Sequence, residues 1–240
     1  MEATSPKLDY SVCKEDTGGI PVIIVAAGNS SRMGGKDKQL MSVLGIPVII
    51  RTLTAFERSP YISRIILVTK PDSIPQIELL AEKYLITKLS DITEGGETRQ
   101  KSVIAGISRL SADEDKVLIS DGARMFVTDD MIKGCAEALK RHDGCLCAIK
   151  VTDTVKSVED GSVKSTVDRS KLYLAQTPQG ITVKLYKKAL EQSNSRDFTD
   201  DVSVLESIGA DVVTVAGSTT NIKITTPDDI ALAELLLKGK

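Results

Sequence analysis

Short runs of apolar residues alternate along this chain with longer segments in which apolar residues recur at helical spacing. The first run, Ile20 to Ala26 (IPVIIVA), is continuous and rich in β-branched residues, which is typical of a buried parallel strand. The same reasoning predicts strands at 64–69, 85–89, 116–120, 145–150 and 212–216. Apolar periodicity predicts helices at 47–56, 74–84, 98–110, 128–140, 183–192, 199–208 and 227–238. This alternation indicates an α/β fold, with a mostly parallel sheet covered by helices on both faces.

The segment 151–174 breaks the alternation, because valines there alternate with polar residues on both sides of Asp160-Gly161. This pattern predicts a β-hairpin with its turn at those two residues. A polar hairpin that emerges from an α/β core is either a dimerisation arm or a decorative surface feature, and the pattern itself favours neither. We therefore expect a loose N-terminal extension (1–19), followed by a single domain (20–240) that carries the hairpin.

A loop of small and cationic residues, VAAGNSSRMGGKDKQL, occupies positions 25–40 at the end of the first predicted strand. Active-site loops of open α/β sheets lie beyond the carboxyl ends of the strands, which here means near 27–38 and 120–125. Ala26, Ala27 and Gly28 leave backbone amides open to a ligand, and such amides bind phosphate oxygens well. The loop matches neither the dinucleotide-binding fingerprint nor the P-loop. Its composition favours a phosphate cradle and leaves a plain solvated loop as the alternative.

Composition and charge narrow the choice of partners. The 31 Lys and Arg residues nearly balance the 33 Asp and Glu residues, so no bulk basic charge favours nucleic acid or a membrane surface. The single histidine, His142, argues against a histidine-based triad or a multi-histidine metal site. The four cysteines are spaced as small buried thiols rather than as a zinc site. No segment has the character of a membrane-spanning helix and the N-terminus lacks an apolar signal core, so we expect a cytoplasmic protein.

The loop at 25–40 resembles the nucleotidyltransferase signature AAGxGxRMxxx(x)KQ, and further motifs follow it in order. They are GGETRQKSVIAGI (95–107), SDGARMFVT (120–128), DTVK (153–156), TVDRSKLYLAQTPQ (166–179), TDD (199–201) and NIKITTPDDIALAE (221–234). In this order and spacing, the chain after Gly19 resembles the 2-C-methyl-D-erythritol 4-phosphate cytidylyltransferase family of sugar- and polyol-phosphate nucleotidyltransferases.

The resemblance implies a Rossmann-like nucleotidyltransferase fold and a homodimer formed through the hairpin arm. It also implies the transfer of CMP from CTP to 2-C-methyl-D-erythritol 4-phosphate with Mg²⁺ as cofactor and pyrophosphate as by-product, a step of non-mevalonate isoprenoid synthesis. Two alternatives stay open: a ribitol-5-phosphate cytidylyltransferase, which shares nearly all these motifs, and a catalytically silent nucleotide-binding homologue.

Site residues follow from the same resemblance, position by position. The catalytic cations would be Arg32, Lys38 and Lys223. The CTP-binding residues would be Ala26, Ala27, Gly28, Ser30, Gly96, Glu97 and Ser102, with Arg99 supporting the second glycine loop. The polyol phosphate would be bound by Asp121, Arg124, Thr154, Arg169 and Thr177, with Asp121 also the Mg²⁺ ligand. In the family the arm crosses to the partner subunit, so Thr154 and Arg169 would serve the neighbouring site.

Some of these residues have simpler explanations. Asp121 suits a turn cap, and Arg169 suits an ion pair with Asp153 across the hairpin. Asp200 and Asp201 follow Thr199 at a predicted helix start, where capping and the helix dipole account for them better than a metal role does.

The motifs also depart from the family pattern at three positions. Ser120 and Met125 replace a histidine and a proline in the strand-end motif, and Ser30 replaces a glycine in the first loop. Because a proline would fix φ at position 125, we expect a slightly more mobile substrate loop rather than an inactive enzyme.

Overall fold

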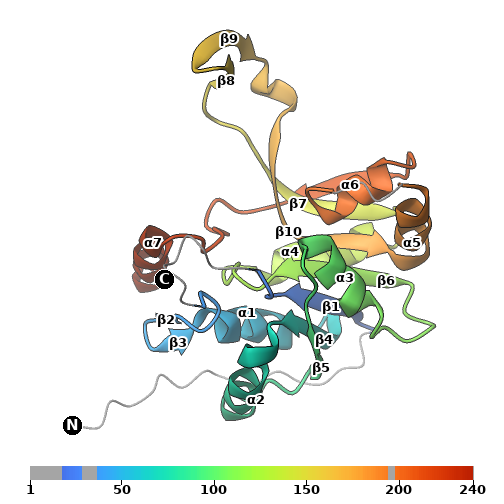
Figure 1. Cartoon of the computed structure of the whole chain (residues 1–240), viewed down its shortest axis with the longest axis vertical. Coiled ribbons are helices and arrows are strands. Elements are labelled where there is room, and N and C mark those ends of the chain that lie inside the picture. Colours follow the sequence, from blue (N-terminus) through green and yellow to red (C-terminus); the bar gives the residue numbers. More distant parts are fainter. Residues whose placement is uncertain (1–17, 29–36, 194–197, 240) are drawn as a thin grey trace.

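The computed structural model describes residues 18–28, 37–193 and 198–239, so the predicted site residues Ser30 and Arg32 lie outside the described residues. A seven-stranded sheet forms the centre of the molecule, in the order β11-β7-β10-β6-β1-β4-β5 (Figure 1). Its strands are β1 (Ile20–Val25), β4 (Ile62–Thr69), β5 (Leu89–Glu94), β6 (Lys116–Asp121), β7 (Gly144–Lys150), β10 (Tyr173–Thr182) and β11 (Val212–Ala216). A small second sheet pairs β2 (Ser42–Val43) with β3 (Ile46–Pro47).

Helices cover both faces of the central sheet, as the sequence predicts. The helices are α1 (Val48–Glu57), α2 (Ile74–Lys83), α3 (Arg99–Ile107), α4 (Asp129–Ala138), α5 (Val183–Gln192), α6 (Asp201–Glu206) and α7 (Pro227–Lys238). Along β1, Val22 and Ile24 pack into the core formed with α1, α2 and α4, whereas Ile23 packs into the core formed with α3, α5 and α6. This alternation follows from the two-residue repeat of a strand and explains why β1 is apolar throughout.

Strand β10 was not predicted, and it runs antiparallel to both of its neighbours, β6 and β7. All other pairings within the sheet are parallel, so the sheet is mostly parallel as expected. Pro178 lies in the middle of β10, where the pairing with β7 shifts register between Ala175 and Gln179. A proline is tolerated inside a sheet at such an irregularity because it has no N–H to donate to the ladder.

The strand predicted at 85–89 is placed wrongly, since β5 begins at Leu89. The preceding residues close the end of α2 instead. Leu85 has a φ of 54°, and the Ile86 amide donates to the Ala81 carbonyl at 2.9 Å. Ile86 is buried in the core, so its apolar character serves the helix end rather than a strand.

The helix predicted at 199–208 is shorter than expected and has a different cap. It spans Asp201–Glu206, and Asp200 rather than Thr199 is its N-cap, with the Ser203 amide donating to Asp200 Oδ1 at 3.1 Å. The predicted cap Thr128 is confirmed at the start of α4, where the Met131 amide donates to its hydroxyl.

The segment 151–174 contains an antiparallel pair, β8 (Val155–Glu159) and β9 (Ser162–Val167), which stands away from the rest of the molecule in Figure 1. Asp160 and Gly161 connect the two strands with φ angles of 49° and 76°. Positive φ at both central residues is the geometry of the two-residue turn that the Asp-Gly pair predicts.

Three of the four cysteines fall in the described residues, and all three are buried. Cys135 and Cys147 bring their sulfurs to 3.6 Å within the core around α4 and β7. No helix among the described residues is long and apolar enough to cross a bilayer.

Candidate active site

The carboxyl ends of β1, β5 and β6 meet at one edge of the sheet, where they surround a cavity of about 420 Å³. This volume lies in the range of small-molecule sites, and the position agrees with the rule for open α/β sheets. The cavity is lined by Val25, Ala27, Gly28, Lys38, Gln39, Gly95, Gly96, Glu97, Thr98, Arg99, Ser102, Asp121, Ala123 and Lys223. Residues from four separate parts of the sequence therefore form one site.

The loop after β5 lies against the loop after β1, and glycine makes this contact possible. A Cβ on Gly95 would lie 2.1 Å from the Cβ of Ala27, and one on Gly96 would lie 2.4 Å from the Cβ of Lys101. The Gly96 amide donates to the Ser102 hydroxyl at 3.1 Å, which ties the loop to the first turn of α3. Two small-residue loops thus meet in the wall of the cavity.

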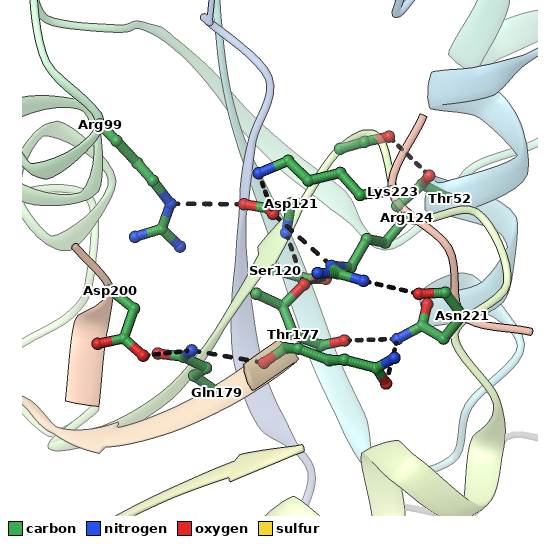
Figure 2. A network of polar contacts seen from close by, with 12 residues as sticks. Thr52, Arg99, Ser120, Asp121, Arg124, Thr177, Gln179, Asp200, Asn221 and Lys223 are labelled. Atoms are coloured by element: carbon green, nitrogen blue, oxygen red, sulfur yellow. Dashed lines mark hydrogen bonds and ion pairs between the residues drawn. The ribbon is translucent and has the colours of Figure 1, made fainter. Parts of the chain in front are cut away.

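Asp121 ends β6 and is the carboxylate on which three cations converge. Lys223 Nζ lies 2.7 Å from Asp121 Oδ2, Arg99 Nε lies 3.4 Å from Oδ1, and Arg124 Nε lies 3.7 Å from Oδ2 (Figure 2). Burial raises the pKa of Asp121, but Lys223, Arg99 and Arg124 outweigh it and lower the pKa to about 2. The carboxylate is therefore ionised at neutral pH.

Strand β10 fixes the backbone of Asp121 through a hydrogen bond to Thr177. The Asp121 amide donates to the Thr177 hydroxyl at 3.0 Å, and the Ser120 hydroxyl lies 3.1 Å from the same oxygen. Asn221 donates from Nδ2 to the Thr177 carbonyl at 2.9 Å, and Arg124 donates to the Asn221 carbonyl at 2.6 Å (Figure 2). These bonds fix the end of β6 relative to the segment that carries Lys223.

Arg99, the first residue of α3, is shared between two carboxylates. Its two terminal nitrogens donate to Asp201 at 2.9 and 2.6 Å. Its Nε faces Asp121 (Figure 2). Both carboxylates raise the pKa of Arg99 against the opposing effect of burial. The backbone amides of Asp201 and Val202 donate to Gln179 Oε1 at 3.0 and 3.2 Å.

Most of the predicted site residues that are described lie around the cavity, and a few do not. Those in the cavity wall are Ala27, Gly28, Lys38, Gly96, Glu97, Ser102, Asp121 and Lys223. Ala26 is buried behind the wall, and its amide donates to the Val68 carbonyl. Thr177 and Arg124 act on Asp121 and Asn221 rather than lining the cavity.

Thr154 and Arg169 lie on the segment that carries the β8–β9 hairpin, and neither lines the cavity of its own chain. Arg169 donates to the Thr152 carbonyl, and no ion pair with Asp153 is present within the described residues. The simpler explanation for Arg169, an ion pair with Asp153, is therefore not what the structure shows, since Arg169 donates to the backbone instead.

Sequence reasoning missed Gln39 as part of the wall. Gln39 is 2% exposed, and its Oε1 has no hydrogen-bond partner within the part of the chain that the structure describes. The only signal in the sequence is its place directly after Lys38 in the KQ pair. A buried acceptor without a donor in a cavity wall is a candidate contact for a bound ligand.

Asp121 is the residue best suited to hold a divalent cation here. The described residues contain no cluster of three or more His, Cys, Asp or Glu side chains that suits a metal ion. Mg²⁺, however, is commonly held by one or two carboxylates together with substrate phosphates and water. A single ionised carboxylate at the edge of a cavity large enough for a small molecule fits that donor set.

Comparisons with known proteins agree on one family. The model of the family described as IspD, 2-C-methyl-D-erythritol 4-phosphate cytidylyltransferase, matches residues 20–239. The enzyme of that name from Bacillus mycoides is 42% identical over 219 residues, covering 90% of this chain and 96% of the relative. The one from Geobacter metallireducens is 40% identical over 225 residues, with 91% and 97% covered. The crystal structure of 4-diphosphocytidyl-2C-methyl-D-erythritol synthase from Anaerococcus prevotii superposes with a TM-score of 0.81 at 32% identity, covering 92% of this chain and 96% of the other.

Proposed function

The chain belongs to the 2-C-methyl-D-erythritol 4-phosphate cytidylyltransferase family and is a cytidylyltransferase, and from this premise we propose how its site works. The reaction transfers CMP from CTP to 2-C-methyl-D-erythritol 4-phosphate. An oxygen of the acceptor phosphate attacks the α-phosphorus of CTP, a new P–O bond forms, and the bond to the β-phosphate oxygen breaks. The products are the CDP-alcohol and pyrophosphate, as in the isoprenoid step that the resemblance implies.

The observation that carries this proposal is the cavity in which Lys38 and Lys223 face two small-residue loops and the carboxylate of Asp121. CTP carries several negative charges on its phosphates, and backbone amides of small-residue loops together with lysines are suitable ligands for them. Catalysis of phosphoryl transfer needs little beyond positioning and charge stabilisation. A site without a nucleophile–base pair is therefore adequate for the chemistry.

We divide the residues of the site into three groups. The loops that contain Ala27, Gly28 and Gly96 would surround the nucleoside, together with Ser102 of α3. We assign Ala26, Ser30 and Glu97 to the same group on the motifs that carry them. Lys38 and Lys223, joined by Arg32, would hold the triphosphate and stabilise the charge that builds up at the α-phosphate. Asp121, Arg124 and Thr177 would act on the acceptor side, where Thr177 and Arg124 fix the position of Asp121.

Mg²⁺ is the cofactor that we propose, and Asp121 would hold it together with phosphate oxygens of the substrate. When bound, the ion would neutralise phosphate charge and polarise the phosphorus–oxygen bond that breaks. The remaining work falls to side chains of the chain itself. Lys223 keeps a positive charge beside Asp121, and the bond from the Asp121 amide to Thr177 keeps the carboxylate at the cavity edge.

We propose further that the β8–β9 hairpin is a dimerisation arm. Val158, Val163, Tyr173 and Leu174 are exposed large apolar side chains on or beside it, and a partner subunit would cover them. Exposed apolar groups gathered on one projecting segment are typical of an interface. Thr154 and Arg169 would then reach the acceptor phosphate in the partner's site. A cytoplasmic location stays a prediction.

A pyrophosphate-release assay tests the reaction. The protein is incubated with CTP and Mg²⁺, with either 2-C-methyl-D-erythritol 4-phosphate or ribitol 5-phosphate as acceptor. We expect faster release with the erythritol derivative. Faster release with ribitol 5-phosphate would assign the chain to the alternative substrate, and CTP binding without turnover on either acceptor would indicate a silent homologue.

Lys38→Ala tests the proposed role of the cations. We expect turnover to fall by a factor of about 10² or more, because the lost charge would act mainly in the transition state. The thermal unfolding temperature should stay close to that of the parent protein. Turnover near the parent value would exclude the role assigned to Lys38.

A further inference from the structure

Asp201 is a buried carboxylate for which the proposed reaction has no direct use. Its side chain is 1% exposed, and it does not cap its own helix, because Asp200 fills that position. Both of its oxygens instead accept hydrogen bonds from Arg99, at 2.9 and 2.6 Å. Burying a carboxylate costs folding free energy unless it is paired in this way. Helix formation alone does not explain why a carboxylate is buried at this position.

The backbone that carries Asp201 is bonded to a side chain of β10. Gln179 Oε1 accepts from the amides of Asp201 and Val202. Gln179 Nε2 donates to Asp200 Oδ2 at 3.2 Å (Figure 2). The first turn of α6 is thereby fixed to β10, next to the residues that hold Asp121. Asp201 is a rigid acceptor rather than a surface charge that follows Arg99.

Arg99 lies between Asp201 and Asp121, and its guanidinium is oriented so that only Asp201 receives two short bonds. Both terminal nitrogens donate to Asp201, and in this orientation Nε faces Asp121 at the longer distance of 3.4 Å. A guanidinium binds a carboxylate best through two parallel N–H···O bonds. Without Asp201, the same guanidinium would turn to Asp121 and occupy its oxygens with two short bonds.

We propose that Asp201 is a positioning residue that keeps the guanidinium of Arg99 off Asp121, so that the Asp121 oxygens stay available to Lys223 and to the divalent cation that accompanies CTP. This inference rests on the proposed function, since it assigns the cation to Asp121. In this proposal Asp201 contacts no substrate, and it affects the Asp121 carboxylate through the position of Arg99. It also gives the aspartate pair Asp200 and Asp201 two distinct roles, one as a helix cap and one in the active site.

The test measures how CTP binding depends on Mg²⁺ in the absence of any acceptor, by calorimetry over a range of Mg²⁺ concentrations. We expect Asp201→Asn to raise the Mg²⁺ concentration for half-maximal CTP binding by about tenfold, the scale of one charge-assisted hydrogen bond. Asp200→Asn is the matched control, because it removes the same charge one residue away and affects the cap of α6 and the bond from Gln179 Nε2. It leaves in place both bonds from Arg99 to Asp201 and the bonds from the amides of Asp201 and Val202 to Gln179 Oε1. It should leave the Mg²⁺ dependence within about twofold of the parent.

A double-mutant cycle separates positioning from a general loss of structure. In an Arg99→Gln background there is no guanidinium to turn toward Asp121, so adding Asp201→Asn should change the Mg²⁺ dependence by less than about twofold. Melting temperatures of all four proteins show which variants are folded at the assay temperature. An unchanged Mg²⁺ dependence in Asp201→Asn, or a tenfold penalty that persists in the Arg99→Gln background, would overturn the proposal. Failure of the parent protein to turn over either acceptor would instead refute the proposed reaction. It would leave the proposal for Asp201 open to the same test, because the measurement of CTP binding requires neither an acceptor nor turnover.

Discussion

Replacement of Lys223 by alanine should separate catalysis from folding more clearly than any other change in the site. The Lys223 side chain is 40% exposed, although its Nζ lies 2.7 Å from an Asp121 carboxylate that is 11% exposed. Without Lys223, Asp121 still has Arg99 at 3.4 Å and Arg124 at 3.7 Å, so its charge remains compensated. Solvent screens an ion pair of this kind, which is worth about 1 kcal/mol or less in folding. We therefore expect the melting temperature to fall by no more than about 2–4 °C.

The effect on turnover should be much larger. If Lys223 faces the α-phosphate of CTP, its charge acts where negative charge builds up in the transition state. Loss of one such preorganised group costs about 10²–10³-fold in kcat, or about 2.7–4 kcal/mol. The loss in transition-state stabilisation should thus be several times the loss in folding free energy, which a purely structural lysine would not produce.

The assay compares pyrophosphate release at saturating CTP and acceptor with thermal unfolding of the same preparations. Lys188→Ala is the control, because it removes an exposed lysine from α5, away from the cavity lining. It should leave both quantities near the parent values. If Lys223→Ala kept kcat within about threefold of the parent, or if its lost activity matched its unfolded fraction, the assigned role would be wrong.

Three further predictions test the arm, the cavity wall and an ion pair far from the site. Deletion of residues 156–166 should convert a dimer into a monomer in sedimentation velocity, and a persistent dimer would refute the arm. Gln39→Leu should raise KM for one substrate by about tenfold with little change in melting temperature, because it removes the acceptor Gln39 Oε1. The partner of this oxygen would be a hydroxyl or amine of the ligand, since ionised phosphates have no proton to donate. An unchanged KM for both substrates would exclude that contact. Arg64 Nη2 lies 2.6 Å from the carboxylate of Glu114 and lowers the pKa of Glu114 in the folded protein. The pair therefore stabilises the fold at a pH above the pKa that Glu114 has in the unfolded chain. This contribution is lost as pH falls through the pKa that Glu114 has in the folded protein. Glu114→Gln should therefore melt below the parent at pH 7, and the difference should shrink as pH falls below the ordinary glutamate pKa and disappear below the lowered pKa of the folded state; a difference that is independent of pH would contradict this reasoning.

The elements that the sequence predicts well are those whose pattern is set by burial alone. Strand β1 and helix α5 coincide with their predicted ranges to within a residue, because each presents either an all-apolar run or one clear apolar stripe. Strand β10 was missed because it contains Pro178, Gly180 and several polar residues that are nevertheless buried. Its polar side chains make specific hydrogen bonds to Asp121 and α6, and no periodicity in the chain reports such bonds.

The residues of the site also fall into those that the sequence predicts and those that it does not. Glycine loops and their neighbouring lysines are local, so the motifs lead directly to Gly28, Lys38 and Gly96. The supporting contacts are not local, since Arg99 and Asp201 are separated by 102 residues and Asp121 and Thr177 by 56. From the chain alone, Asp201 looks like any acidic residue at a helix start, and only the fold shows that its carboxylate faces Arg99.

The contacts of Asp121 and Asp201 together set the net charge at the edge of the cavity. Arg99, Arg124 and Lys223 carry three positive charges toward Asp121, and Asp201 supplies the second negative charge. One positive charge is left over at the cavity edge, and Lys38 adds another in the cavity wall, where the charge of Glu97 is paired with Lys101. An excess of this sign in a partly enclosed cavity attracts an anion such as a triphosphate and repels a free cation. A divalent ion would therefore reach Asp121 most easily in the company of the nucleotide, which is the condition under which the role of Asp201 should become visible.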